Sequence, residues 1–124
     1  MNSHRHFLLF GALSGFLTVA FGAFAAHGLE NLLSATMLST FQTGVEYQGL
    51  HALALLAVGM LGRSANSAGL SLAGWSFVVG ILLFSGSLYL LALTGTRWLG
   101  IITPFGGTAF LVGWAALVWH AYRA

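Results

Sequence analysis

Polar side chains that could bind a ligand or carry a proton occur within or beside the apolar stretches of this chain. A carboxyl group, imidazole rings, phenols and hydroxyls together can hold a proton, a small ligand or a lipid headgroup. The candidate site residues are Glu46, His51, Tyr47, His27, Ser85, Tyr89 and Thr103. Tyr47 and His51 share a helix face, whereas Glu46 and His51 lie about 140° apart around a helix and need not touch.

Metal, haem and nucleophilic chemistry find little support in the same residues. The chain contains no cysteine, which excludes thiol catalysis and thiolate metal sites. The histidines show no paired metal-binding spacing, and an axial haem pair would need two at equal depth. His27 and His51 differ in depth by roughly 10 Å at the rise of a helix. We therefore predict no catalytic residue, no metal and no cofactor.

The composition fixes the kind of element that must carry these residues. Only 5% of the residues are charged and 58% are hydrophobic, with a mean hydropathy of +0.90, whereas a soluble domain is about a quarter charged. An all-α integral membrane protein follows, folded as a single domain over residues 1–124. Its four-helix bundle is predicted to have membrane helices at about 7–27, 44–62, 68–93 and 104–123.

Two connecting segments show signals of their own. Residues 29–42 alternate apolar and polar faces, so they form either a short interfacial helix between the first two spans or an extension of the second span. Thr103 and Pro104 are typical of a helix start, with the threonine as cap. A secretory signal peptide is the rival interpretation of the first span, but its apolar stretch is too long.

The arginines predict the orientation of the bundle. One end of the bundle collects Arg5, Arg63 and Arg123, and the other has Arg97 and Glu30, with Glu46 near it. The positive-inside rule then places both termini in the cytoplasm and the polar residues in the outer half. Glu46 would lie about one turn from the boundary and face protein. It is predicted to be either a structural partner of Arg97 or His27, or a proton or ligand site.

Small residues form two helix faces that allow close helix packing. These are Gly11, Gly15, Thr18, Gly22 and Ala26 on the first span, and Gly106, Ala109, Gly113 and Ala116 on the fourth. Such faces let helices approach closely in lipid. We expect them to pack within the bundle, and they are also candidates for docking a membrane-protein partner or a second copy.

Four sequence blocks resemble the YgdD-like family of small bacterial inner-membrane proteins, which has eukaryotic transmembrane relatives. The blocks are residues 22–29, 42–48, 83–89 and 103–107. The resemblance implies four membrane helices and assigns no activity. The positions that match its motifs are His27, Gln42, Glu46, Tyr47, His51, Ser85, Ser87, Tyr89, Thr103 and Pro104. Ala26 departs from the glycine that the family often has there.

Three classes of function remain open. The leading hypothesis is a non-enzymatic inner-membrane protein whose outer polar residues bind a small ligand, a lipid headgroup or a proton. The alternatives are an accessory subunit of another membrane protein and, less favoured, a haem- or quinone-linked oxidoreductase. The bilayer is the expected partner. The four arginines form no patch and the chain has no lysine, so nucleic acid is not an expected partner.

Overall fold

The computed structural model describes residues 3–65 and 67–123, and within these ranges the chain is a bundle of long apolar helices. Four of the described helices are long and apolar enough to cross a membrane: His4–His27, Ala35–Leu61, Ala68–Thr94 and Arg97–Arg123. The prediction of an all-α membrane bundle is confirmed. Asn66, in the loop between the second and third spans, lies outside the described residues, as does Ala124.

The helices have the following bounds. They are α1 (Ser3–His27), the 3-10 turn η1 (Leu29–Asn31), α2 (Ala35–Leu61), α3 (Ala68–Gly80), the π-helical segment η2 (Ile81–Ser85), α4 (Gly86–Thr94), the 3-10 turn η3 (Arg97–Ile101) and α5 (Thr103–Arg123). The third predicted span is therefore one continuous membrane helix with a π-helical turn inside it, and the segment before α5 is a 3-10 turn.

The predicted interfacial segment is not a separate helix. It divides into η1 and the first turns of α2, which begins at Ala35 because the Ser34 hydroxyl accepts a hydrogen bond from the Met37 amide. Its apolar face is used for packing, since Leu29 and Phe41 are buried together with Ala25 and Ala92. The amphipathic pattern of residues 29–42 thus reflects a small core at this end of the bundle.

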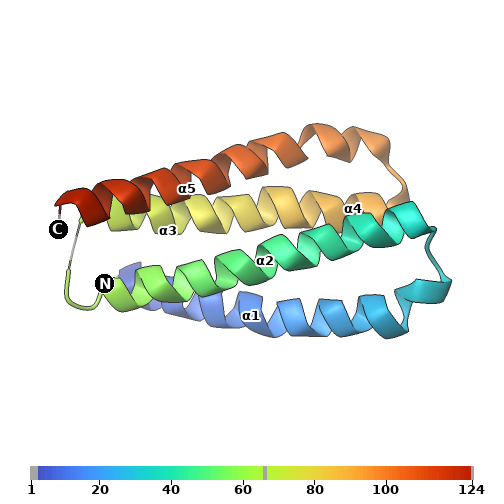
Figure 1. Cartoon of the computed structure of the whole chain (residues 1–124), viewed down its shortest axis with the longest axis horizontal. Helices are drawn as coiled ribbons and strands as arrows, with labels where there is room; N and C mark the ends of the chain where they lie inside the picture. Colours follow the sequence, from blue (N-terminus) through green and yellow to red (C-terminus); the bar gives the residue numbers. More distant parts are fainter. Residues whose placement is uncertain (1–2, 66, 124) are drawn as a thin grey trace.

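Both termini lie at one end of the bundle, together with the loop between α2 and α3 (Figure 1). In space, α1 packs along α2, α2 also contacts α3 and α4, and α5 packs along α3 and η2. The main core runs between these layers and includes Phe7, Leu55, Phe77 and Phe110. Phe77 and Leu55 have no exposed surface, so their side chains are fully enclosed by the helices around them.

The small-residue face of α5 packs inside the bundle. A Cβ added at Gly106 would lie 2.3 Å from the backbone nitrogen of Phe84, and one at Gly113 would lie 2.5 Å from the Phe77 ring. On α1, a Cβ added at Gly11 would lie 3.0 Å from the Ala52 carbonyl oxygen of α2, whereas Gly15 has nothing within 4 Å. Most of these small residues therefore bring helices of one chain together, as expected for packing in lipid.

Candidate functional site

The seven predicted site residues do not form one cluster. The structure distributes five of them among three separate hydrogen-bonded groups, each of which joins neighbouring helices. One of these five, Tyr47, takes part only through its backbone carbonyl, and its side chain is 42% exposed. The other two, Glu46 and His27, are exposed on the surface. Depth along the bundle was therefore a poor guide to which side chains meet, because residues at similar depth point to different faces of their helices.

The first group joins α1, α2 and α4. The Tyr89 hydroxyl donates to the Gln48 Oε1 atom, and Gln48 Nε2 donates to the Ser14 carbonyl over 3.3 Å. Gln48 is only 3% exposed, so its amide is held by partners on two other helices. One turn away, the Ser85 hydroxyl donates to the Gly44 carbonyl over 2.7 Å. These bonds fix the position of α2 against its neighbours.

The second group centres on His51. Its Nδ1 atom lies 2.7 Å from the Tyr47 carbonyl oxygen, and its Nε2 atom accepts from the Trp114 indole N–H over 3.0 Å. The ring also stacks on Phe110, with centroids 3.6 Å apart and planes inclined by 7°. Both nitrogens of this buried histidine are occupied, so the ring is a structural link between α2 and α5.

The third group joins α4 to α5. The Ser87 and Thr103 hydroxyls lie 2.6 Å apart, and Ser87 also donates to the Phe84 carbonyl over 2.9 Å. Thr103 was predicted to cap the last span. Its hydroxyl instead bonds across to Ser87 and lies 3.5 Å from the Leu99 carbonyl oxygen of the preceding turn. The residue therefore ties two helices together at the outer end.

Glu46 lies on the surface of the bundle, which corrects the expectation that it faces protein. Its side chain is exposed, and no described residue bonds to its carboxylate, neither Arg97 nor His27. Its neighbour Val45 lies beside Gly22 of α1. Gly22 comes five residues before the end of α1, so Glu46 lies about 8 Å below that end of the helix. The periodicity of α2 explains its exposure, because its buried positions 44, 48, 51, 55 and 58 fall on another face.

An apolar groove of about 310 Å³ lies between α1 and the continuous helix formed by α3, η2 and α4. The groove is lined by Phe10, Leu13, Ser14, Leu17, Phe21, Gln48, Leu55, Val78, Ile81, Leu82, Gly86 and Tyr89. Leu13 and Leu82 are 52% and 67% exposed, whereas Leu55 is fully buried. The groove therefore has a buried base and an exposed rim within the apolar length of the bundle.

Sequence reasoning did not assign Gln48, Ser14 or Trp114 to the site. Gln48 was predicted only as a hydrogen-bond partner between helices, although it lies three residues before His51 and seven before Leu55 on the buried face of α2. Ser14 contributes only a backbone carbonyl, and Trp114 looks like any apolar residue of its span. The partners of Gln48 and His51 follow from the way the helices pack together.

Comparison with known proteins agrees with this architecture. The family described as "Protein of unknown function (DUF423)" matches residues 21–107. A UPF0382 membrane protein of Staphylococcus saprophyticus is 49% identical over 117 residues, covering 94% of this chain and 97% of the relative. One of Haemophilus influenzae is 49% identical over 119 residues, covering 95% of this chain and 94% of the relative.

The UPF0382 inner membrane protein YgdD of Escherichia coli is 42% identical over 119 residues, which cover 96% of this chain and 91% of that protein. No solved structure shows a significant match to the chain. The four sequence blocks that resembled the YgdD-like family all lie within the matched range, and that prediction is confirmed. With a family match over most of its length and relatives aligned from end to end, this chain belongs to the DUF423 family of integral membrane proteins.

Proposed function

We propose that this protein is a non-enzymatic inner-membrane protein that holds the acyl chain of a bilayer lipid in the groove between α1 and the α3–η2–α4 helix. The carrying observation is the groove itself. Its volume of about 310 Å³ is at the lower end of the range for ligand sites, about 300–1,000 Å³. Its exposed rim residues would give lipid direct lateral access.

The chemistry of the lining favours an apolar chain over the polar ligands considered from the sequence. The groove spans residues 10–21 of α1, the central part of a helix that ends at Ser3 and His27, so it lies at the depth of lipid tails. Three polar side chains belong to its wall, Ser14, Gln48 and Tyr89, and the last two already bond to each other. A headgroup would have to compete with those bonds.

The π-helical segment supports the same assignment. Ile81 and Leu82 belong to it and line the groove, as does Gly86, the first residue after it. A Cβ added at Gly86 would have only the Ile81 carbonyl oxygen within reach, at 4.0 Å. Here the groove stays open because glycine provides no side chain. Such π-helical turns occur frequently at functional sites.

Filling the groove is the direct test. The leucine of a Gly86→Leu variant would project into the groove without a backbone clash, and Gly15→Leu is the matched control, because Gly15 has open space around it and does not line the groove. Each purified protein is placed in phosphatidylcholine bilayers with an acyl chain that carries a photoreactive diazirine. Cross-linked residues are then identified by peptide mass spectrometry.

We expect the parent protein and Gly15→Leu to be labelled at groove residues such as Leu17 and Val78, and Gly86→Leu to lose most of this labelling. Labelling of exposed residues elsewhere, such as Val118, should stay constant and normalises the signal. If Gly86→Leu is labelled in the groove as strongly as the parent, the groove is not a chain site and the proposal is wrong.

We further propose that both termini face the cytoplasm. The support is that the end with the termini carries Arg5, Arg63 and Arg123, whereas the opposite end carries only Arg97. Reporter fusions after Arg123 that are active only in the cytoplasm would agree with this orientation. Activity of a periplasmic reporter at the same position would reverse it.

A second candidate function, an accessory subunit, is favoured by one observation, the exposed carboxyl group of Glu46. An acidic side chain within a membrane span has an insertion cost of up to about 3 kcal/mol, which a cationic residue on a partner helix would offset. A second copy of this chain has no arginine at that depth, because its four arginines lie at the ends of the bundle. The proposed partner is thus a different membrane protein with a basic residue in its span.

This candidate can be tested with designed partner helices. A synthetic polyleucine helix with one arginine at the depth of Glu46 should associate with the parent protein in vesicles, as measured by energy transfer between attached dyes. Association should disappear with Glu46→Gln and with an all-leucine helix. Equal association in all three cases would rule out Glu46 as the docking residue.

A further inference from the structure

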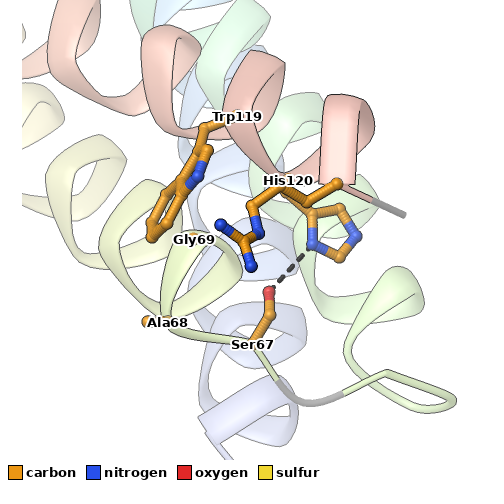
Figure 2. Close-up of a pocket in the computed structure, with 6 residues that line it drawn as sticks. Ser67, Ala68, Gly69, Trp119 and His120 are labelled. Carbon is orange, nitrogen blue, oxygen red and sulfur yellow. Dashed lines mark hydrogen bonds between the residues drawn. The ribbon is translucent and has the colours of Figure 1, made fainter.

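A second hollow, of about 400 Å³, lies at the end of the bundle that holds both termini. It is formed where α3 begins and α5 ends, and its lining consists of Ser67, Ala68, Gly69, Trp119, His120 and Arg123. Figure 2 shows the Ser67, Trp119 and His120 side chains around this space. The lining of this hollow is more polar than that of the apolar groove, because a guanidinium, an imidazole and a hydroxyl contribute to its wall.

Arg123 carries the one permanent charge among the residues that line the hollow. Arg123 lines it, and the Arg123 Cζ atom lies 5.9 Å from the centroid of the Trp119 ring, a cation–π distance that holds the guanidinium beside the hollow. The chain has only two acidic side chains, Glu30 and Glu46. Glu30 is in η1 at the opposite end, and Glu46 lies well inside α2, so neither neutralises Arg123.

Further hydrogen-bond donors belong to residues that line the hollow. The Ser67 Oγ atom accepts from the Leu70 amide over 3.1 Å and lies 2.8 Å from His120 Nδ1. When the Ser67 hydroxyl donates to Nδ1, the proton of the neutral ring is on Nε2, which is then a free donor. The amides of Ala68 and Gly69 begin α3, where the helix itself offers no acceptor.

The depth of the hollow matches the headgroup layer. Trp119 and Arg123 occupy the last turn and a half of the final span, and Trp and Arg residues at span ends lie at the level of lipid headgroups. Basic hollows between membrane helices at this level can bind anionic lipid headgroups. An oxyanion there would meet Arg123, the histidine and the start of a helix together.

We propose that this hollow binds a phosphate group, with Arg123 as the principal ligand and His120 and the first amides of α3 as further donors. The phosphate of an anionic phospholipid and free inorganic phosphate share this chemistry. The site shares α3 with the apolar groove but lies at the opposite end of that helix's depth range, against α5 in place of α1, and it does not depend on the groove function.

The test compares two variants that lose the same charge at the same end of the bundle. Arg123→Gln removes the proposed ligand, and Arg63→Gln removes an exposed arginine outside the hollow. The purified chain in non-ionic detergent is titrated with phosphatidylglycerol or phosphatidylcholine of identical acyl chains, and bound lipid is counted by native mass spectrometry. Inorganic phosphate binding is measured in parallel by calorimetry. Helical circular dichroism confirms that each variant is folded.

We expect the parent protein to bind one phosphatidylglycerol at least about five-fold more tightly than phosphatidylcholine, as one interfacial arginine contributes about that factor. Arg123→Gln should lose this preference and Arg63→Gln should keep it. Binding of phosphatidylglycerol alone identifies the lipid as the source, and phosphate binding that Arg123→Gln abolishes identifies the free anion. The proposal would be overturned if Arg123→Gln and Arg63→Gln lost anion binding equally. It would also be overturned if the parent protein neither preferred phosphatidylglycerol to phosphatidylcholine nor bound inorganic phosphate.

Discussion

The Trp114 indole nitrogen donates a hydrogen bond to the Nε2 atom of His51 over 3.0 Å. An indole N–H can only donate, so Nε2 must be the unprotonated nitrogen, and Nδ1 must carry the proton that it donates to the Tyr47 carbonyl. His51 is therefore a neutral ring with both nitrogens occupied. Binding of a metal, a haem or a second proton would require one of these bonds between or within helices to break.

Removal of the indole donor should destabilise the bundle. In a Trp114→Phe variant the buried Nε2 atom loses its donor, and hydrogen bonds between membrane helices contribute about 0.6 kcal/mol on average. We expect the free energy of unfolding, measured by SDS titration in mixed micelles, to fall by at least that amount. Trp98→Phe is the control, because Trp98 is 61% exposed in η3. Equal stability of both variants would show that the bond contributes nothing.

Replacement of Glu46 by glutamine should leave the fold intact. The carboxylate is exposed and has no described cationic partner, so Glu46→Gln leaves no buried charge unpaired. We expect the thermal unfolding midpoint in mild detergent to match that of the parent. A variant that unfolds where the parent survives would mean that Glu46 has a structural partner.

Replacement of glycine by alanine should destabilise the bundle at closely packed positions and stabilise it at open ones. Gly106→Ala places a Cβ 2.3 Å from the Phe84 backbone nitrogen, and overpacking of this kind typically costs about 1–3 kcal/mol. Gly15→Ala meets nothing within 4 Å and should stabilise α1 by about 0.5–1 kcal/mol through its higher helix propensity. Chemical unfolding of the two variants should shift in opposite directions. A shift in the same direction would mean that the α5–η2 approach is looser than described.

Removal of the Tyr89 hydroxyl should lower the stability of the bundle more than removal of an exposed phenolic hydroxyl. Tyr89→Phe removes the donor to the Gln48 Oε1 atom, which is buried, whereas Tyr122→Phe alters a residue that is 88% exposed. We expect only Tyr89→Phe to lower the free energy of unfolding, by about 0.6 kcal/mol. If Tyr122→Phe lowers the free energy of unfolding as much, the effect of Tyr89→Phe cannot be assigned to the bond with Gln48.

The span count and the approximate span limits could be predicted because they depend on local hydropathy. Ser34 shows where such reasoning became uncertain. With Ser34 as cap, α2 begins at Ala35, nine residues before the predicted start at Gly44, because the apolar residues Leu38 and Phe41 find a packing surface on α1 and α4. The sequence of residues 29–42 does not reveal this surface, because it belongs to other helices.

The partners of the polar side chains could not be predicted for a related reason. Seven residues along α2 separate Gln48 from Leu55, and both lie on its buried face, yet the acceptor of the Gln48 amide is a backbone carbonyl on α1, 34 residues away. Glu46 was assigned to the interior because of its cost in lipid, and the structure places it outside. Insertion cost predicts that a polar residue needs a partner and does not say where the partner is.

The contacts between α1 and α2 have a consequence for biogenesis. Of the four described spans, α2 is the least apolar, and it carries Glu46, Gln48 and His51, so it would partition poorly into lipid by itself. Gln48 finds its acceptor on α1, and Gly11 and Gly59 let the two backbones meet. We therefore expect the translocon to release α1 and α2 together as a helical hairpin, with α2 dependent on the span synthesised before it.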